Sequence, residues 1–314
     1  MARYEKGLQA VGDGLYAYLQ PDGGWGWSNA GLVVDGESTL LVDTLFDLRL
    51  TEEMLRVMRR AVPAAARIDT LVNTHANGDH CYGNQLVSDA RIVASERTAV
   101  EMSELPPAAM AALIEQAPHM GELGAFFLDC FGSFDFGEIQ LTLPQQTFDD
   151  ELTLAVGARQ LHLIDVGPAH TRGDTLVHAA AERVLFTGDI LFSGSHPIVW
   201  AGPVSNWIAA CERILAMDVE VIVPGHGPLA SPAAVRELKA YFEYLYEQAR
   251  ERHAAGMSAP QAARSITLDR WATWGNAERL VVTIASIYGE LDGDHRPANP
   301  LVAFEQMAEL ARSG

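Results

Sequence analysis

Four short strand-like runs in this sequence are each followed within a few residues by histidine or aspartate. Each run is short, apolar and rich in β-branched residues, as expected for a strand buried in a sheet. The four places are Thr74-His75-Ala76-Asn77-Gly78-Asp79-His80 after residues 70–73, His170 after 161–166, Asp189 after 184–187, and His226 after 219–223. Side chains at strand ends can be brought to one edge of a sheet scaffold. We therefore predict a single site built from segments far apart in the sequence.

The residues gathered in this way are typical metal ligands. Imidazoles and carboxylates without thiolates suit Zn²⁺, Fe or Mn²⁺. Cys81 directly follows His80, but a free cysteine commonly acts as a small buried apolar residue, and we interpret Cys81 in that way. The sequence predicts a centre for one or two divalent ions, with zinc expected and manganese or iron as alternatives.

Composition places the chain among ordinary globular proteins. Its 314 residues are 48% hydrophobic and 20% charged, which suits one large domain or two small ones. The three cysteines are scattered and odd in number, which predicts no disulfide framework and favours a reducing compartment. The N-terminus lacks the apolar stretch of a signal peptide, and no apolar run approaches the length of a membrane span. We expect a cytoplasmic protein that does not contact membranes.

The net charge of −19 narrows the range of partners. The sequence has no dense run of Lys and Arg, and a nucleic-acid-binding protein normally shows a basic patch. We therefore expect a small-molecule substrate and no nucleic acid. A homodimer is an alternative that the sequence leaves open.

Alternating β-type runs and turns fill most of the first 230 residues. Further strands are predicted over 15–20, 30–34, 40–43, 91–94, 139–143, 151–154 and 175–180. Thr51 is expected to be the N-cap of a helix with Glu52 and Glu53 in its first turn. Residues 97–135 are rich in Ala, Met, Leu and Phe and predict two or three helices inserted between strands near the active site. They form either a lid or pocket wall, or ordinary packing helices.

From Ser231 onward the pattern is helical. Ser231 is the expected N-cap of a helix with Pro232 at its first position. Further helices are expected over 259–265, 277–291 and 300–312. The predicted organisation is a main domain over 1–230 and a helical C-terminal extension over 231–314 that packs on it.

The strand-end motifs, taken together, resemble those of the metallo-β-lactamase superfamily. That family has a His-x-His-x-Asp-His loop, a distant His, a distant Asp and a last His, and this chain shows the same order from about Asn29 to Gly227. Asp43, in Leu41-Val42-Asp43-Thr44, matches the family's early strand-end aspartate. The resemblance implies an α/β (α+β) fold, the four-layered αβ/βα sandwich, with the site at one edge. The helical tail resembles that of glyoxalase II-like members.

The resemblance also implies a set of ligands. One metal position would use His75, residue 77 and His170, and the other would use Asp79, His80 and His226, with Asp189 as a bridge. Asn77 departs from the family, which has histidine there. An amide oxygen is a weaker zinc ligand than an imidazole. Three outcomes stay open: one metal at the second position, two metals with Asn77 as an oxygen ligand, or an inactive site.

The function expected from this resemblance is metal-dependent hydrolysis. The metal would activate water for attack on the acyl carbon of an ester, thioester, lactone or amide-like bond in a small apolar or aromatic metabolite. Asp79 would orient or deprotonate that water, and Asp43 would hold a ligand imidazole. The alternatives are a tailoring enzyme of secondary metabolism with iron or manganese chemistry (an oxygenase, cyclase or decarboxylase) and a non-catalytic metal-binding homologue.

Several residues near the predicted ligands are candidates for contact with the substrate. Trp25 and Trp27 lie in a glycine-rich loop of a kind that family members often place over the site, although core packing is an equal alternative. The other candidates adjoin predicted ligands or lie just past Asp189: Tyr82, Arg172, His196 and Trp200.

Overall fold

The first of two sheets is formed by the N-terminal half of the chain. The structure, a computed structural model, describes residues 4–294, 296 and 299–312. The seven strands lie in the order in which they occur in the sequence. Neighbouring strands from β1 to β4 are antiparallel, and those from β4 to β7 are parallel. The strands are β1 (Gly7–Gly12), β2 (Leu15–Leu19), β3 (Ala30–Asp35), β4 (Ser38–Val42), β5 (Thr70–Val72), β6 (Arg91–Ser95) and β7 (Gln146–Phe148).

The second sheet packs against the first. Its order is β12-β11-β10-β9-β8, antiparallel except for the parallel pair β11 and β12. Its strands are β8 (Glu151–Val156), β9 (Arg159–Asp165), β10 (Thr175–Ala179), β11 (Val184–Phe192) and β12 (Val221–His226). Between the sheets lies a core to which Val42 and Val72 contribute from one side and Val177 and Phe186 from the other. A Cβ at Gly31 would collide with the ring of Phe186, so glycine allows the two sheets to approach.

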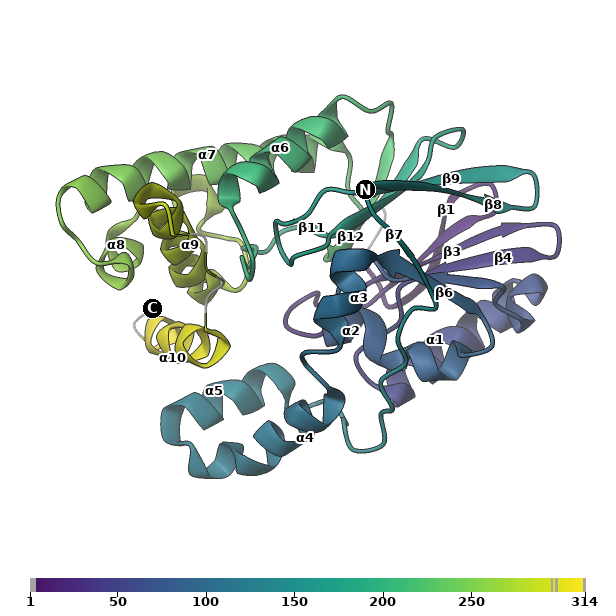
Figure 1. Cartoon of the computed structure of the whole chain (residues 1–314), viewed down its shortest axis with the longest axis horizontal. Coiled ribbons are helices and arrows are strands. Elements are labelled where there is room, and N and C mark those ends of the chain that lie inside the picture. The colour runs from purple at the N-terminus through teal and green to yellow at the C-terminus, as the bar shows by residue number, and fades with distance from the viewer. Residues whose placement is uncertain (1–3, 295, 297–298, 313–314) are drawn as a thin grey trace.

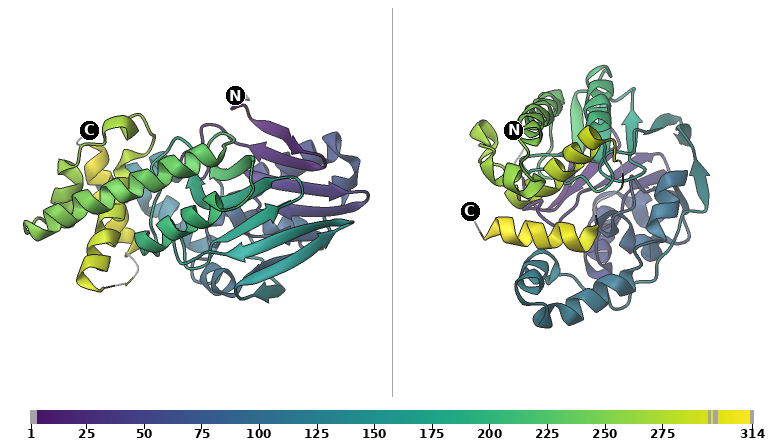
Figure 2. Two further views of the ribbon diagram at one scale, coloured as in Figure 1. Left: turned by 90° about the horizontal axis from the view of Figure 1, so that it is seen from above. Right: turned by 60° about the vertical axis from the view of Figure 1, so that its left-hand side comes forward.

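Helices cover the outer face of each sheet and complete four layers (Figure 2). On the first sheet, α1 (Leu48–Ala61) buries one apolar stripe, because Leu50, Met54 and Met58 recur at helical spacing. The short α2 (Gly78–Cys81) and α3 (Glu96–Met102) follow β5 and β6. On the second sheet, α6 (Val204–Leu215) and α7 (Pro232–Ala254) pack side by side.

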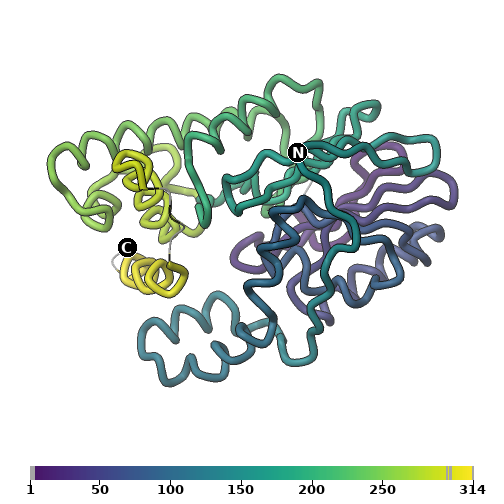
Figure 3. Tube along the Cα trace, in the orientation of Figure 1, coloured from purple at the N-terminus to yellow at the C-terminus, as the bar shows by residue number. Residues whose placement is uncertain are grey.

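Two groups of helices extend beyond this sandwich and meet each other. The first is α4 (Pro107–Gln116) and α5 (Gly121–Phe131), which project from the sheets in Figure 3. The second is α8 (Ala259–Ser265), α9 (Leu280–Asp292) and α10 (Pro300–Ala311). Helix α10 contacts α5, although nearly 170 residues separate them in the sequence (Figure 1). The 3₁₀ helices are η1 (Pro63–Ala66), η2 (Tyr82–Val87), η3 (Ala117–His119), η4 (Asp269–Trp271) and η5 (Ala277–Arg279).

Most predicted elements are confirmed, including the helices within 97–135 and the helix over 259–265. The prediction that Thr51 is an N-cap is wrong. Helix α1 begins earlier, because the Asp47 carboxylate accepts a hydrogen bond from Leu50 N at 2.7 Å and caps it. Thr51 lies inside the helix and its hydroxyl donates to the Asp47 carbonyl.

The predicted strand over 139–143 is also wrong. Side chains satisfy the backbone there instead of a neighbouring strand: Gln85 accepts from Gln140 N, and Asn84 donates to the Thr142 carbonyl. The edge position belongs to β7. The sequence predicts Asp189 just after a strand, but β11 continues through it to Phe192 alongside β12. Within the described part of the chain, no helix is both long enough and apolar enough to cross a bilayer.

Candidate metal centre

The predicted ligands converge at one edge of the sandwich, where the two sheets meet. The first sheet contributes residues from the loop after β5 and from α2. The second sheet contributes residues from the loop after β9, from within β11 and from the end of β12. They are His75, Asn77, Asp79 and His80 from the first sheet, and His170, Asp189 and His226 from the second. All except Asn77 are buried. The site therefore bridges the two halves of the fold.

Imidazole nitrogens and carboxylate oxygens face one another across this edge. His80 Nε2 lies 3.1 Å from Asp189 Oδ1, and His226 Nε2 lies 3.2 Å from Asp79 Oδ2. His170 Nε2 lies 3.3 Å from Asp189 Oδ2. Two groups of three ligand atoms are compact enough to hold a metal ion: His75 with His80 and Asp189, and Asp79 with His80 and His226.

The chemistry of this cluster fits a divalent cation. The Nε2 atoms of His75 and His80 and Oδ1 of Asp189 are buried without a hydrogen-bond partner in the described structure. Such atoms are costly unless another group satisfies them. A Cβ at residue 225 would collide with Asp189 Oδ1, so Gly225 keeps room beside that oxygen.

The titration behaviour of the cluster shows the same demand for positive charge. Burial alone would lower the pKa of His226, but Asp189 and Asp79 outweigh it and raise the pKa to about 9. Burial would also lower the pKa of His80, but Asp189, Asp79 and Asp43 outweigh burial and raise that pKa well above its usual range. Burial raises the pKa of Asp189, but the surrounding imidazoles outweigh burial and hold it well below its usual range. Either protons or a metal ion supplies the positive charge that these buried carboxylates require.

Buried partners orient the imidazoles with Nε2 toward the cluster. Asp43 Oδ2 accepts from Nδ1 of His80 at 2.9 Å, and it also accepts from the Thr74 hydroxyl at 2.7 Å. Nδ1 of His170 donates to the Ile198 carbonyl at 2.8 Å. Such contacts fix the ring tautomer, so the lone pair of Nε2 points inward in both His80 and His170.

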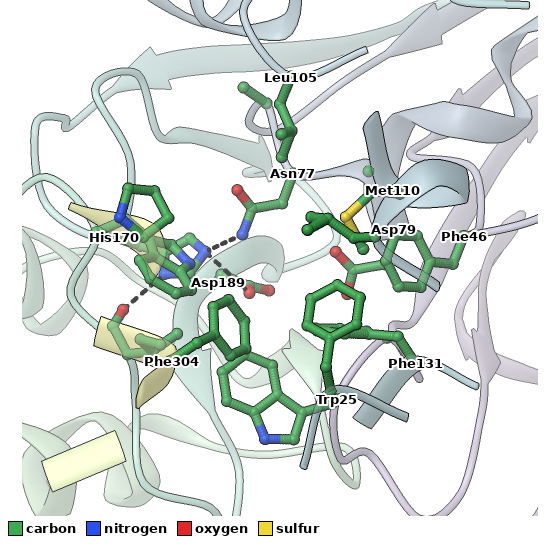
Figure 4. A pocket seen from close by; sticks show the side chains of 18 of the residues that line it. Trp25, Phe46, Asn77, Asp79, Leu105, Met110, Phe131, His170, Asp189 and Phe304 are labelled. Carbon is green, nitrogen blue, oxygen red and sulfur yellow. Dashed lines mark hydrogen bonds and ion pairs between the residues drawn. The ribbon is translucent and has the colours of Figure 1, made fainter. Parts of the chain in front are cut away.

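The side chain of Asn77 contacts the imidazole of His170, which is a predicted metal ligand. Its Nδ2 lies 2.9 Å from Nε2 of His170 (Figure 4). Because the other nitrogen of His170 already donates, Nε2 is an acceptor, and the Asn77 amide donates to it. The amide thus occupies a lone pair that would otherwise be free for a metal. Neither compact group of ligand atoms includes His170.

An apolar cavity of about 470 Å³ opens onto these ligands. Its floor includes Asp79, Asp189, His170 and His226. In Figure 4 the rings of Trp25, Phe131 and Phe304 gather on one side of the labelled carboxylates. The apolar walls come from the Trp25 loop, the segment after β4, the region from α4 to α5, the segment after β11, and α10. The residues are Trp25, Phe46, Met110, Leu113, Met120, Leu123, Phe127, Phe131, Ile198, Trp200, Leu301 and Phe304.

Four of the six predicted substrate contacts line this cavity: Trp25, Tyr82, Arg172 and Trp200. The Tyr82 hydroxyl donates to the Leu105 carbonyl, and Arg172 pairs with Glu101 and Glu104.

The other two predicted contacts have different surroundings. Trp27 packs on Phe134 with ring centroids 4.9 Å apart. His196 is fully buried with Nδ1 2.8 Å from the Tyr241 hydroxyl. Cys81 is buried, and burial raises the pKa of its thiol well above the usual range, so it has no thiolate to offer a metal.

Sequence reasoning missed the contribution of the C-terminal extension to the cavity. Phe304 on α10 and Arg279 on η5 both line it. The helical pattern of these segments was visible, but nothing in the sequence indicated which helix they would contact.

The family model for the metallo-beta-lactamase superfamily matches residues 23–226. The chain belongs to this superfamily. That range contains every predicted ligand, and the expected fold is confirmed by similarity to solved structures.

Two relatives and two structures illustrate the similarity of this superfamily member to known proteins. Acyl-coenzyme A thioesterase MBLAC2 from Homo sapiens is 28% identical over 215 residues, which cover 63% of this chain and 72% of the relative. The 2,4-dinitroanisole O-demethylase subunit alpha from Nocardioides sp. (strain JS1661) is 26% identical over 217 residues, which cover 68% of this chain and 56% of the relative.

The solved structures share the fold at lower sequence identity. The sec-alkylsulfatase Pisa1 from Pseudomonas sp. has a TM-score of 0.67 at 16% identity, with 94% of this chain covered. This chain spans 52% of that enzyme, about half its length. A beta-lactamase domain protein from Burkholderia ambifaria has a TM-score of 0.64 at 17% identity and covers 90% of this chain and 89% of that one.

Proposed function

We propose that this protein is a metal-dependent hydrolase of acyl-type bonds, acting on an ester, thioester, lactone or amide-like bond next to an apolar or aromatic group. The observation that carries the proposal is the apolar cavity whose floor is the His and Asp cluster. Pockets of this kind bind the apolar body of a ligand, and a few polar groups fix its orientation. The relatives named as acyl-coenzyme A thioesterases support the same class of reaction.

The residues of the site have distinct tasks in this reaction. Asp79, His80 and His226 would hold the metal, with Asp189 beside them, and the metal would supply Lewis acidity and lower the pKa of a water molecule. Asp79 lines the cavity, and its carboxylate would orient or accept a proton of that water. Asp43 keeps the His80 ring in place through its 2.9 Å contact with Nδ1. The apolar walls exclude bulk water, which strengthens these electrostatic interactions.

Hydrolysis assays with ester and thioester substrates test the proposal directly. Zinc-loaded protein is assayed with p-nitrophenyl acetate, butyrate and octanoate, and with acetyl- and octanoyl-coenzyme A. We expect hydrolysis that chelation abolishes and added zinc restores, with kcat/KM rising with acyl length because each buried methylene contributes about 0.8 kcal/mol. Metal-independent hydrolysis, or none in any metal-loaded form, would contradict the proposal.

Metal analysis of the purified protein separates the two alternatives. Bound iron or manganese with redox activity supports a tailoring enzyme such as an oxygenase, cyclase or decarboxylase. A protein that binds no metal from zinc, manganese or iron solutions supports a non-catalytic homologue. Bound zinc with esterase activity supports the hydrolase.

A further inference from the structure

The amide of Asn77 has a second N–H group that the fold does not use. Its first N–H donates to His170 Nε2 at 2.9 Å, and within the described residues this is the one hydrogen bond of the side chain. Asn77 precedes the first turn of α2, but its side chain does not cap that helix. The side chain is half-buried and lines the cavity. One amide N–H is therefore left for a molecule bound in the cavity.

The partner of Asn77 holds this amide in one orientation. His170 is fully buried, and its Nδ1 donates to the Ile198 carbonyl at 2.8 Å. Its ring packs edge to face on Phe192 and Trp207, with centroids 5.6 and 5.9 Å apart. Because the imidazole is fixed on both sides, its Nε2 is a fixed acceptor, and the Asn77 nitrogen must point toward it. The donor is thus in place before a substrate binds.

This donor lies at the end of the cavity that carries the ligands. His170 Nε2, which accepts from Asn77, is 3.3 Å from Asp189 Oδ2, and His226 Nε2 is 3.5 Å from the same oxygen. In Figure 4 the amide nitrogen of Asn77 lies on the side of Asp189 and the amide oxygen points away from it. A substrate carbonyl at the metal centre would therefore meet the N–H group of Asn77 and not its oxygen.

Other hydrogen-bond donors in the cavity lining are already engaged. The Tyr82 hydroxyl donates to the Leu105 carbonyl at 2.9 Å, and the Trp25 indole donates to Glu278, also at 2.9 Å. Neither can turn toward a substrate without losing its present partner. Asn77 differs from both, because the contact that orients it uses only one of its two N–H groups.

We propose that Asn77 is a catalytic residue whose second N–H donates to the oxyanion that forms from the substrate carbonyl. This inference rests on the proposed function. The family has a ligand histidine at this position, and here an amide supplies a hydrogen-bond donor in its place. A donor that is fixed in advance, in a cavity from which bulk water is excluded, stabilises a developing negative charge without reorganising.

The step that Asn77 assists is the addition of water to the acyl carbon. As the water oxygen bonds to that carbon, the π electron pair of the carbonyl becomes a lone pair on its oxygen, and the water proton passes to Asp79. The Asn77 N–H stabilises the negative oxygen. The lone pair then re-forms the double bond, the bond to the leaving group breaks, and the leaving group takes the proton from Asp79. The hydrogen bond is strongest when the charge on the oxygen is largest, so it lowers the barrier more than it strengthens substrate binding.

A binding experiment tests the proposal without relying on turnover. Octyl trifluoromethyl ketone and octyl methyl ketone are titrated calorimetrically into the zinc-loaded wild type, Asn77→Ala and Asn77→Gln. The trifluoromethyl ketone hydrates to a tetrahedral form that resembles the intermediate, whereas the methyl ketone stays planar. We expect Asn77→Ala to lose about 100-fold of the affinity for the trifluoromethyl ketone. Its affinity for the methyl ketone should change by less than threefold, and Asn77→Gln, which keeps the amide on a longer chain, should be intermediate.

Kinetics and a matched control exclude a merely structural role. With p-nitrophenyl octanoate, Asn77→Ala should lower kcat about 100-fold and leave KM within threefold of the wild type, as expected for an interaction made in the transition state. Phe304→Ala is the control, because Phe304 lines the same cavity with an apolar ring. It should weaken the binding of both ketones to the same extent. Zinc content per chain is measured for every variant and should equal that of the wild type.

Each result bears on the proposal. Equal affinity of the wild type and Asn77→Ala for the trifluoromethyl ketone overturns it. Equal losses for the two ketones in Asn77→Ala also overturn it, because Asn77 then contacts the planar ground state. A zinc content that falls together with the affinity shows that Asn77 is a metal ligand and not an oxyanion donor. Loss of the preference for the trifluoromethyl ketone in Asn77→Ala, in a protein that hydrolyses no substrate, upholds the donor while the proposed hydrolysis fails.

Discussion

At the residue scale, we propose that Asn77 determines how many metal ions the site holds. Its amide donates to His170 Nε2 at 2.9 Å, so the position built from His75 and His170 has lost both a ligand and a free lone pair. We predict that wild-type protein loaded with excess zinc retains about one ion per chain, and that Asn77→His retains about two, because an imidazole is the better zinc ligand. Elemental analysis after desalting measures this. Asn77→Ala is the control and should remain at one ion, and equal zinc content in wild type and Asn77→His would refute the role given to residue 77.

His196 should make the folded protein less stable as the pH falls. Burial, and then the charge of Arg279, lower its pKa to about 4, whereas an unfolded histidine has about 6.5. Below pH 6.5 the unfolded chain binds a proton that the folded chain refuses, so this contribution to stability is complete above pH 6.5 and is lost as the pH falls toward 4. Between pH 7.5 and 5 the wild type should lose about 2 kcal/mol more than His196→Gln does. Urea denaturation of both proteins at the two pH values measures this, and parallel losses would show that His196 is not the group responsible.

At the scale of helices and strands, an element can be predicted from the sequence when the residues that determine it lie within the element itself. Strands that end in His or Asp, and the helix over 259–265, follow from patterns within a few residues. The strand expected over 139–143 has a β-type pattern, but its backbone bonds to Asn84 and Gln85, which no pattern within the segment indicates. For the same reason the helical character of α10 was predictable and its contact with α5 was not. The residues of the candidate metal centre could be predicted to converge because their order along the chain is informative, whereas Arg279 joins the cavity only through that packing.

The contact between α10 and α5 places Phe304 of α10 in the wall of the cavity. Phe304 is half-buried, and its ring centroid lies 5.6 Å from that of Trp25, 5.7 Å from that of Phe131 and 5.8 Å from that of Trp200. Phe304→Ala removes a shared wall of the cavity and should reduce affinity for octanoate at least fivefold, with stability lowered by about 2 kcal/mol. Val302→Ala on the same helix is the control, because that side chain is 47% exposed and does not line the cavity. Calorimetric titration and urea denaturation give the two quantities, and equal octanoate affinity in Phe304→Ala and Val302→Ala would remove α10 from the binding site.

At the scale of the whole molecule, the candidate metal centre lies between the two sheets and takes residues from both. Asp79 and His80 follow β5 of the first sheet, whereas Asp189 and His226 belong to β11 and β12 of the second. An ion held by both sets binds the folded protein and not the unfolded chain, so it stabilises the fold by about 2.7 kcal/mol at 100 times its dissociation constant. The unfolding entropy is about 2.1 cal/mol/K per residue, so for 314 residues chelation should lower Tm by about 4 °C.

Because His226 has a raised pKa of about 9, protons compete with the metal, and the Tm shift produced by a fixed zinc concentration should be larger at pH 8 than at pH 6. Calorimetric scans with and without chelator at both pH values measure this, and His226→Ala, which leaves one set incomplete, should show the smallest shift. A shift that is the same in His226→Ala and wild type would mean that the stabilising ion binds elsewhere and that the two sheets hold together without it.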